Sequence, residues 1–300
     1  MKEQEKKSMK QIKIGTCVPG AKAEEWLKGF IGKGFETFSF NFHMSLEGTD
    51  LDKLALSTEK LLAGTDSKIT TVGYYCNPIQ YADHRKTLEK VICTAEKFGA
   101  THVSTFAGAW EGKPVESAYE EFGKVFRELA DLAEEKGVKL GIENCLMDGT
   151  WEHATCNIGF NPKAWEVMFE EVKNDNFGLE WEPTHQMVQL IDPVTELRKW
   201  CKKIVHVHGK DATIDWDAVR HGGISGAVPF VWHRMPGFGD TNWRDIISIL
   251  RSNGYEDDIC IEGYHDPVYS GELEMTGQLH ALNYLKWCRG GEFTPTPWEK

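Results

Sequence analysis

The feature of this sequence that most restricts its fold is a regular alternation between short β-rich runs and longer segments with helical periodicity. The helical segments include HRKTLEKVICTAEKFGA (84–100) and DTNWRDIISILRSNG (240–254), and several end at or next to a glycine. Eight units of strand followed by helix predict a (β/α)₈ TIM barrel of the α/β class. The expected strands are residues 12–18, 35–42, 69–75, 101–107, 138–144, 177–182, 204–208 and 258–262.

An open, doubly wound sheet is the competing architecture for such an alternation. That fold carries a glycine fingerprint after its first strand, and GTCVPGAKAEE (15–25) does not supply it. A length of 300 residues also suits one barrel. We therefore expect residues 1–300 to form a single TIM-barrel domain, with residues 1–10 as a disordered N-terminal extension.

Charge and cysteine content restrict the partners and the compartment. The 34 basic and 46 acidic residues give a formal net charge of −12, which a polyphosphate backbone would repel, so we expect no nucleic-acid partner. The eight cysteines include no C-x-x-C pair, which favours a reduced, cytoplasmic protein over a disulfide framework. No stretch approaches the roughly 18 apolar residues of a membrane span, so we expect no membrane partner.

The period-two alternation of a strand separates polar from apolar side chains in the last four β-rich runs. One face of each run carries Val, Leu, Ile or Trp, which can pack against a ring of helices. The other face would point into the barrel lumen. Because active sites of TIM barrels lie at the carboxyl ends of the strands, we expect four side chains to meet there: Glu143, Glu182, His208 and Glu262.

Three carboxylates gathered in a low-dielectric site repel one another and would take up protons. A divalent cation removes this cost. Three carboxylates and one imidazole form a mostly oxygen ligand set, which favours Mn²⁺ or Mg²⁺, although Zn²⁺ and Co²⁺ also bind such sets. We predict one bound dication, Mn²⁺ in the first place, with His208 as a ligand. His206, one layer deeper, would support the site or pack beneath it.

Six segments of the chain are similar to the sugar phosphate isomerase/epimerase family of xylose isomerase-like barrels. This family includes ketose 3-epimerases, inosose dehydratases and isomerases, and C-glycoside deglycosidases. The similarity runs from residue 12 to about residue 284. Its most specific parts are GIENC (141–145), NIGFNPKAWEVMFEEV (157–172), FGLEWEPTH (177–185), IVHVHGKD (204–211), RMPGFGDTNWRDIISIL (234–250) and ICIEGYHDPV (259–268).

The resemblance implies the same four metal ligands that the strand alternation selects, with Glu143 and Glu262 also serving as the catalytic acid/base pair. His185 and Arg234 fall where the family contacts its substrate. Asp211 follows the ligand histidine in an H-x-K-D pattern. With His206, these three residues form our set of candidate substrate-site residues.

Two departures from the family pattern stand at the site. Glu182 occupies a position where the family usually has Asp before Pro, so its side chain is one methylene longer, and the neighbouring Glu180 could take part instead. After Glu262, the segment EGYHDP replaces the more usual EHEDP and introduces Tyr264 and His265. Both departures weaken any inference from the family's substrates to the substrate of this protein.

Such a site supports removal of a proton next to a carbonyl group, with a metal-stabilised enediolate. Return of the proton gives an epimerase or isomerase of a sugar, polyol or keto-sugar, which is our first expectation. Loss of a β-substituent gives a lyase on an oxidised sugar or cyclitol, of the inosose dehydratase or 3-keto-C-glycoside deglycosidase type. A metal-dependent endonuclease or a non-catalytic sugar-binding barrel are the remaining alternatives.

The segment from Gly209 to Gly239 is too long for an ordinary barrel connection, and its centre, HGGISGAVPFVW (221–232), is rich in glycine with an apolar tip. Long loops in compact domains are usually functional. We expect this segment to cover the mouth of the barrel or to contact another subunit of a homo-oligomer.

Overall fold

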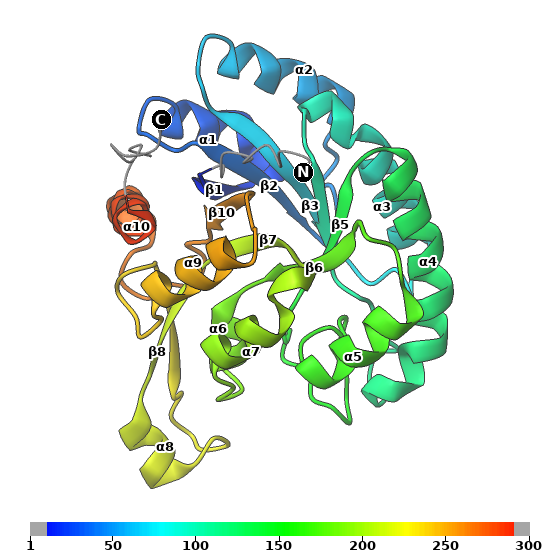
Figure 1. The fold of residues 1–300 in the computed structure, drawn as a ribbon, viewed down its shortest axis with the longest axis vertical. Helices are drawn as coiled ribbons and strands as arrows, with labels where there is room; N and C mark the ends of the chain where they lie inside the picture. Colours follow the sequence, from blue (N-terminus) through cyan, green and yellow to red (C-terminus); the bar gives the residue numbers. More distant parts are fainter. Residues whose placement is uncertain (1–10, 291–300) are drawn as a thin grey trace, which may run out of the picture.

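Eight parallel strands form a closed barrel in the computed structural model, which describes residues 11–290 (Figure 1). The strands follow one another around the ring in the order β1-β10-β7-β6-β5-β4-β3-β2, so the last barrel strand pairs with the first. The predicted (β/α)₈ barrel is confirmed, whereas the expected extension, residues 1–10, lies outside the described residues. The barrel strands are β1 (Lys13–Pro19), β2 (Thr37–His43), β3 (Lys68–Tyr75), β4 (His102–Thr105), β5 (Lys139–Glu143), β6 (Phe177–Trp181), β7 (Ile204–Gly209) and β10 (Asp258–Ile261).

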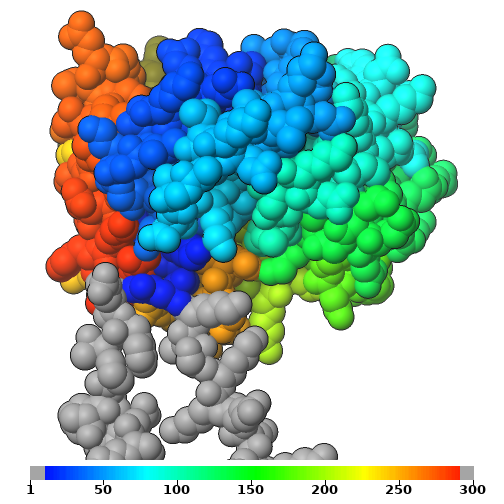
Figure 2. All heavy atoms as spheres, turned by 90° about the horizontal axis from the view of Figure 1, so that it is seen from above, coloured from blue at the N-terminus to red at the C-terminus, as the bar shows by residue number. Residues whose placement is uncertain are grey.

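Helices cover the outside of the barrel. Figure 2 shows successive segments side by side around the molecule, with α10 next to the first segments of the chain. The Lys286 ammonium of α10 donates to the Gly34 carbonyl oxygen at 2.6 Å, which ties the two ends of the ring together. The helices are α1 (Ala23–Phe30), α2 (Leu51–Leu62), α3 (Ala82–Thr94), α4 (Tyr119–Glu135), α5 (Pro162–Glu171), α6 (Pro183–Met187), α7 (Pro193–Trp200), α8 (Trp216–Gly222), α9 (Trp243–Ser252) and α10 (Glu274–Arg289), with short 3₁₀ turns η1 (Gly20–Lys22), η2 (Ala95–Phe98), η3 (Val115–Ala118), η4 (Cys201–Lys203) and η5 (Gly271–Leu273).

Residues just before the helices fix where several of them begin. The side chains of Asp50, Asn161 and Asp192 each accept a hydrogen bond from a backbone N–H in the first turn of α2, α5 and α7. In α5 and α7 a proline follows directly, at a position where a helix needs no N–H donor. Within residues 11–290, no helix is long and apolar enough to cross a membrane.

The two faces of the barrel strands differ in chemistry. Outward-facing Leu140, Ile142 and Leu179 are fully buried beneath the helices. The lumen of a TIM barrel is usually filled by bulky aliphatic side chains. Here it is filled largely by polar ones, among them Ser39, Thr71, Ser104, Glu180 and His206, which are also fully buried. A polar lumen leads directly into the site at the mouth.

We expected a long loop from Gly209 to Gly239, but the structure shows a small second sheet in this segment. Strands β8 (Asp211–Ile214) and β9 (Val231–Arg234) pair in antiparallel fashion, and α8 lies between them. This hairpin projects away from the barrel in Figure 1, with Trp216, Ile224 and Val228 exposed near its end. It stands on the β7 side of the mouth, where its base continues directly from the strand that carries His208.

Candidate metal centre

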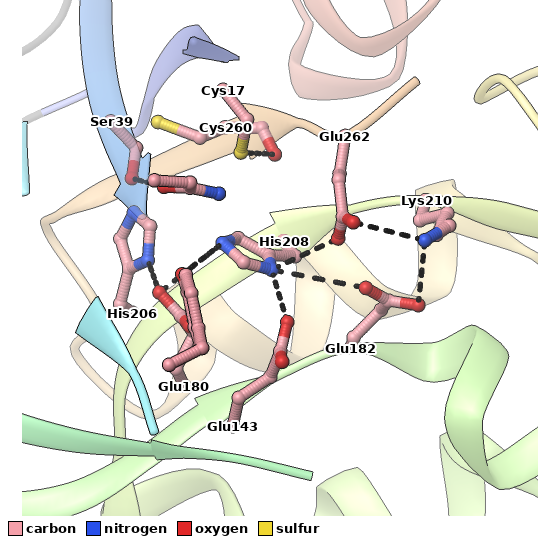
Figure 3. A network of polar contacts seen from close by, with 12 residues as sticks. Cys17, Ser39, Glu143, Glu180, Glu182, His206, His208, Lys210, Cys260 and Glu262 are labelled. Carbon is pink, nitrogen blue, oxygen red and sulfur yellow. Dashed lines mark hydrogen bonds and ion pairs between the residues drawn. The ribbon is translucent and has the colours of Figure 1, made fainter. Parts of the chain in front are cut away.

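The four predicted ligands lie together at the carboxyl end of the barrel (Figure 3). Glu143 is the last residue of β5 and His208 lies near the end of β7, while Glu182 and Glu262 directly follow β6 and β10. One ligand atom from each of the four lies within 4.8 Å of all the others. Neighbouring strands of a closed barrel thus bring together side chains that are far apart in the sequence.

His208 occupies the centre of this group. Its Nδ1 atom lies 2.9 Å from Glu143 Oε1, 3.1 Å from Glu262 Oε2 and 3.8 Å from Glu182 Oε2. All four side chains are buried or nearly so. One imidazole nitrogen therefore points at the same small volume as three carboxylates.

Several oxygen atoms at this centre have no hydrogen-bond partner among the described residues. Both carboxylate oxygens of Glu182 and the Oε2 atom of Glu262 are buried and accept no hydrogen bond. Buried carboxylate oxygens without a hydrogen-bond donor are unfavourable. A divalent cation would satisfy them, because three carboxylates and one imidazole are a suitable ligand set for such an ion. The residues present therefore fit the predicted metal.

The pKa values of the three carboxyl groups are shifted by burial and by their charged neighbours. Burial raises the pKa of Glu143 to about 7, against the lowering effect of His208. Burial, together with the charges of Glu262 and Glu143, raises the pKa of Glu182 well above its ordinary value. For Glu262, burial acts in the same direction, but the charges of Lys210 and His208 outweigh it and hold the pKa well below normal.

Lys210 is a cation inside the site that our sequence analysis left without a role. Its Nζ atom lies 3.0 Å from Glu262 Oε1 and 3.9 Å from Glu182 Oε1, and the side chain is almost fully buried. Burial lowers the pKa of this ammonium group, but the two carboxylates outweigh it and raise the pKa above its ordinary value. Lys210 therefore stays charged and offsets part of the negative charge.

A second polar layer lies beneath the four ligands. Glu180 Oε1 lies 2.6 Å from His206 Nδ1 and 3.2 Å from His208 Nε2, and Glu180 Oε2 accepts a hydrogen bond of 2.9 Å from the Tyr75 hydroxyl. Burial raises the pKa of Glu180, yet the charge of His208 and the hydrogen bonds from both histidines outweigh it, so this carboxyl has a pKa far below normal. Figure 3 shows Glu180 and His206 to the left of the His208 ring, on the side away from Glu182 and Glu262.

A cavity of about 730 Å³ opens above the centre. Glu143, Glu262 and Lys210 lie in its lining, and His185 and His233 form part of one wall. Its other walls include apolar side chains, namely Phe106, Leu146, Met147 and Val188. Such a volume is within the usual range for a small-molecule site.

The predicted substrate-site residues fall in different places. His185 lines the cavity, with its Nε2 atom 3.3 Å from Glu182 Oε1. His206 lies in the layer beneath. Arg234 and Asp211 are absent from the cavity lining. The Arg234 Nε atom lies 3.3 Å from Asp266 Oδ2. Asp211 accepts hydrogen bonds from backbone N–H groups of the hairpin and the following turn. A substrate contact by either residue stays a prediction.

Sequence reasoning gave no role to Lys210, Tyr75 or His233. A signal existed for Lys210, because the alternation that selects His206 and His208 continues to residue 210 when the strand is extended by two residues. Tyr75 ends the run ITTVGYY on the lumen face. His233 could not be found locally, since the hairpin that carries it was not expected.

The chain belongs to the xylose isomerase-like TIM barrel family, whose model matches residues 33–286. Among curated relatives, it is 26% identical over 227 residues to an inosose dehydratase of Clostridium tetani, covering 73% of this chain and 72% of the relative. It is also 28% identical over 171 residues to the rhizopine catabolism protein MocC of Rhizobium meliloti, covering 56% and 47% of the two chains.

Solved structures show the same fold. The 3-keto-D-glucoside 4-epimerase of E. coli superimposes with a TM-score of 0.68 at 15% identity, covering 93% of this chain and all of that chain. The IOLI protein with a bound zinc atom gives a TM-score of 0.64 at 20% identity, covering 92% and 96%. At these identities the superpositions establish the architecture alone.

Proposed function

We propose that this protein is a divalent-metal-dependent enzyme that removes a proton next to the carbonyl group of a sugar or keto-sugar and returns it, as an epimerase or isomerase. The observation that carries this proposal is the convergence of Glu143, Glu182, His208 and Glu262 around one centre at the mouth of the barrel. The cavity above this centre is large enough for a small substrate. The names of the relatives, which include epimerases and dehydratases, agree with this class of chemistry.

The four side chains would hold one dication, with Mn²⁺ as the proposed ion because three of the four ligands are carboxylates. The zinc found in the IOLI protein makes Zn²⁺ the first alternative. When bound, the dication supplies a fixed positive charge that stabilises negative charge developing on the carbonyl oxygen of the substrate.

Glu143 and Glu262 are the proposed acid/base pair. They approach the centre from β5 and from the end of β10, two strands that do not pair with each other, and both lie in the cavity lining. One carboxylate takes the proton from the carbon next to the carbonyl, and the other returns a proton to the opposite face or to the adjacent carbon. Such groups typically contribute about 10²- to 10⁴-fold to a rate.

Two neutral histidines would contact the hydroxyl groups of the substrate. Burial lowers the pKa of His185 well below its ordinary value and lowers that of His233 to about 4. Each ring therefore offers one hydrogen-bond donor and one acceptor at neutral pH. This pairing suits a polyol, whose hydroxyls both donate and accept.

A second candidate is a lyase that dehydrates a cyclitol ketone or an oxidised sugar. The curated relatives named inosose dehydratase favour it. The first step is the same proton removal, after which the electron pair forms a carbon–carbon double bond and the hydroxyl on the next carbon leaves as water, protonated by the second carboxyl group. The two candidates differ only in the fate of the electron pair after the shared proton removal.

Incubation of a panel of aldoses, ketoses and inososes with the protein in D₂O, followed by NMR, tests both candidates. For the epimerase or isomerase, we expect Mn²⁺-dependent incorporation of one deuteron at the carbon that receives the returned proton, abolished by EDTA and restored by added Mn²⁺ or Zn²⁺. A new stereoisomer or positional isomer supports the epimerase or isomerase, and an unsaturated product with loss of water supports the lyase. Turnover that survives complete removal of the metal would contradict both.

A further inference from the structure

Glu180 is a fully buried carboxylate, and the lining of the cavity above the centre does not include it. It contacts three potential donors: the Tyr75 hydroxyl at 2.9 Å, His206 Nδ1 at 2.6 Å and His208 Nε2 at 3.2 Å. Burying a carboxylate is unfavourable unless its surroundings compensate the charge. Glu180 lies directly beneath the proposed metal centre, so we looked for a role of this carboxylate in metal binding.

The two ring nitrogens of His208 face opposite layers. Nδ1 points at the carboxylates of Glu143 and Glu262, and Nε2 points at Glu180 (Figure 3). A neutral imidazole carries only one ring proton, and a nitrogen that binds a metal must be free of it. The ring can therefore serve as a ligand through Nδ1 only when its proton is on Nε2.

We propose that Glu180 is the positioning residue for His208: it accepts the proton of His208 Nε2 and thereby presents Nδ1 to the divalent cation. This inference rests on the metal site of the proposed function. Outer carboxylates that orient a ligand histidine are a general device of metal sites. Without Glu180, the best acceptor for the ring proton is Glu143, only 2.9 Å from Nδ1, and a proton placed there blocks coordination.

Glu180 is itself held in place from below. His206 lies between Glu180 and Asp258, with its Nε2 atom 3.4 Å from Asp258 Oδ1. The Thr70 hydroxyl donates to Asp258 Oδ2 at 2.6 Å. A row of side chains from β10, β7 and β6 thus fixes the position of the Glu180 carboxylate. In this arrangement His206 supports the Glu180 carboxylate from below, and its ring also packs edge-on against the His208 ring at 5.5 Å between centroids.

The competing explanation is that Glu180 merely balances the charge of His206. In that case Glu180 contributes to the stability of the fold and does not contribute to metal binding. The chain offers a matched control in Glu36, a carboxylate at the opposite end of the barrel that accepts hydrogen bonds from the Ile14 N–H and from Arg289. Glu180→Gln and Glu36→Gln make the same chemical change, one beside His208 and one remote from it.

Titration of the metal-free full-length proteins with Mn²⁺ and Co²⁺ separates these explanations. We expect Glu180→Gln to weaken metal binding by about 10- to 100-fold and to change the visible spectrum of bound Co²⁺. Glu36→Gln should leave both unchanged, even if it lowers the unfolding temperature. A folded Glu180→Gln protein with the metal affinity and Co²⁺ spectrum of the natural protein would overturn this inference alone. Failure of the natural protein to bind metal would overturn the proposed site as well.

A second measurement is made on the natural protein and uses a variant only to assign signals. In the natural protein with ¹⁵N-labelled histidine, loaded with Zn²⁺, long-range ¹H–¹⁵N spectra report which ring nitrogen carries the proton. We expect His208 to be protonated at Nε2 and coordinated through Nδ1, with the signals assigned by their loss in His208→Gln. Coordination through Nε2 would overturn the inference. So would a second equivalent of Zn²⁺ bound through His206 Nε2, because the row beneath Glu180 would then be a ligand set rather than a support.

Discussion

At the scale of single residues, Lys210 is central to the charge balance of the site. It supplies the ammonium group that lies against Glu262 and near Glu182, and both of these carboxylates are buried. A metal ion bound at the proposed centre would compensate the same negative charges as Lys210 does. The two cations should partly substitute for one another.

This overlap predicts the behaviour of Lys210→Met, a change that keeps the length of the side chain and removes its charge. We expect the metal-free variant to lose about 3 to 5 kcal/mol of unfolding free energy, because one partner of a buried ion pair is removed. The loss should be smaller in saturating Mn²⁺, and Mn²⁺ should bind more tightly than to the natural protein. Urea unfolding with and without Mn²⁺ measures both quantities.

Lys139→Met is the control for this experiment. Lys139 begins β5 at the other end of the lumen, where its ammonium lies 2.7 Å from Asp257 Oδ2. Its replacement should destabilise the protein equally with and without Mn²⁺. Equal losses for both variants under both conditions would show that Lys210 and the metal do not share their carboxylates.

At the scale of elements, the strands of the barrel could be predicted because each is a local pattern, whereas the hairpin could not. The period-two alternation places Glu143, Glu180 and His208 in the lumen from a few neighbouring letters each. The hairpin depends instead on contacts across the chain: Asp211 accepts hydrogen bonds from the backbone N–H groups of Gly237 and Thr241. No local pattern in the glycine-rich segment between β8 and β9 reports such a contact.

The amino-terminal end of the lumen is closed by an ion pair between elements, and this pair predicts a pH effect. Burial raises the pKa of Asp257, but two basic neighbours outweigh it and lower the pKa to about 2. These are His102, whose Nε2 atom lies 3.6 Å from Asp257 Oδ2, and Lys139, which donates a hydrogen bond of 2.7 Å to the same oxygen. A lowered carboxyl pKa stabilises the folded state above the unfolded pKa, near 4, and the contribution is lost as the pH falls from about 4 to about 2.

Asp257→Asn should therefore lower the unfolding free energy by about 1 kcal/mol at pH 7, a figure reduced for the partial exposure of the side chain. The difference from the natural protein should shrink toward pH 3. Thermal unfolding from pH 7 to pH 3 measures this, with the exposed Asp175→Asn as the control. A difference that stays constant over this range would contradict the role of the ion pair.

At the scale of the whole molecule, the barrel and the site form one body and the hairpin stands apart from it. Of the hairpin strands and the segment between them, only His233 lines the cavity. Trp216, Ile224, Val228 and Trp232 are exposed on the projecting part (Figure 1). The structure therefore gives the end of the hairpin no contact with the site, and the predicted contact with another subunit stays a prediction.

Shortening the hairpin tests its role. Ile214 pairs with Val231, so a two-residue Asn-Gly turn can replace residues 215–230 without disturbing the strands. We expect unchanged metal affinity, turnover and unfolding temperature. Sedimentation of both proteins shows whether the removed part joins subunits. A marked rise in KM for the shortened protein would instead show that the hairpin reaches over the mouth during turnover.

The closure of the barrel by β10 has a consequence for biosynthesis. Three of the four side chains that meet at the centre are in place once β5, β6 and β7 have paired, but Glu262 arrives only with the strand that also joins the two ends of the sheet. Until β10 has been synthesised and has paired, a nascent chain lacks Glu262 and therefore one of the four proposed ligands. Complete binding of a dication at the proposed centre would therefore report that the ring of strands has closed.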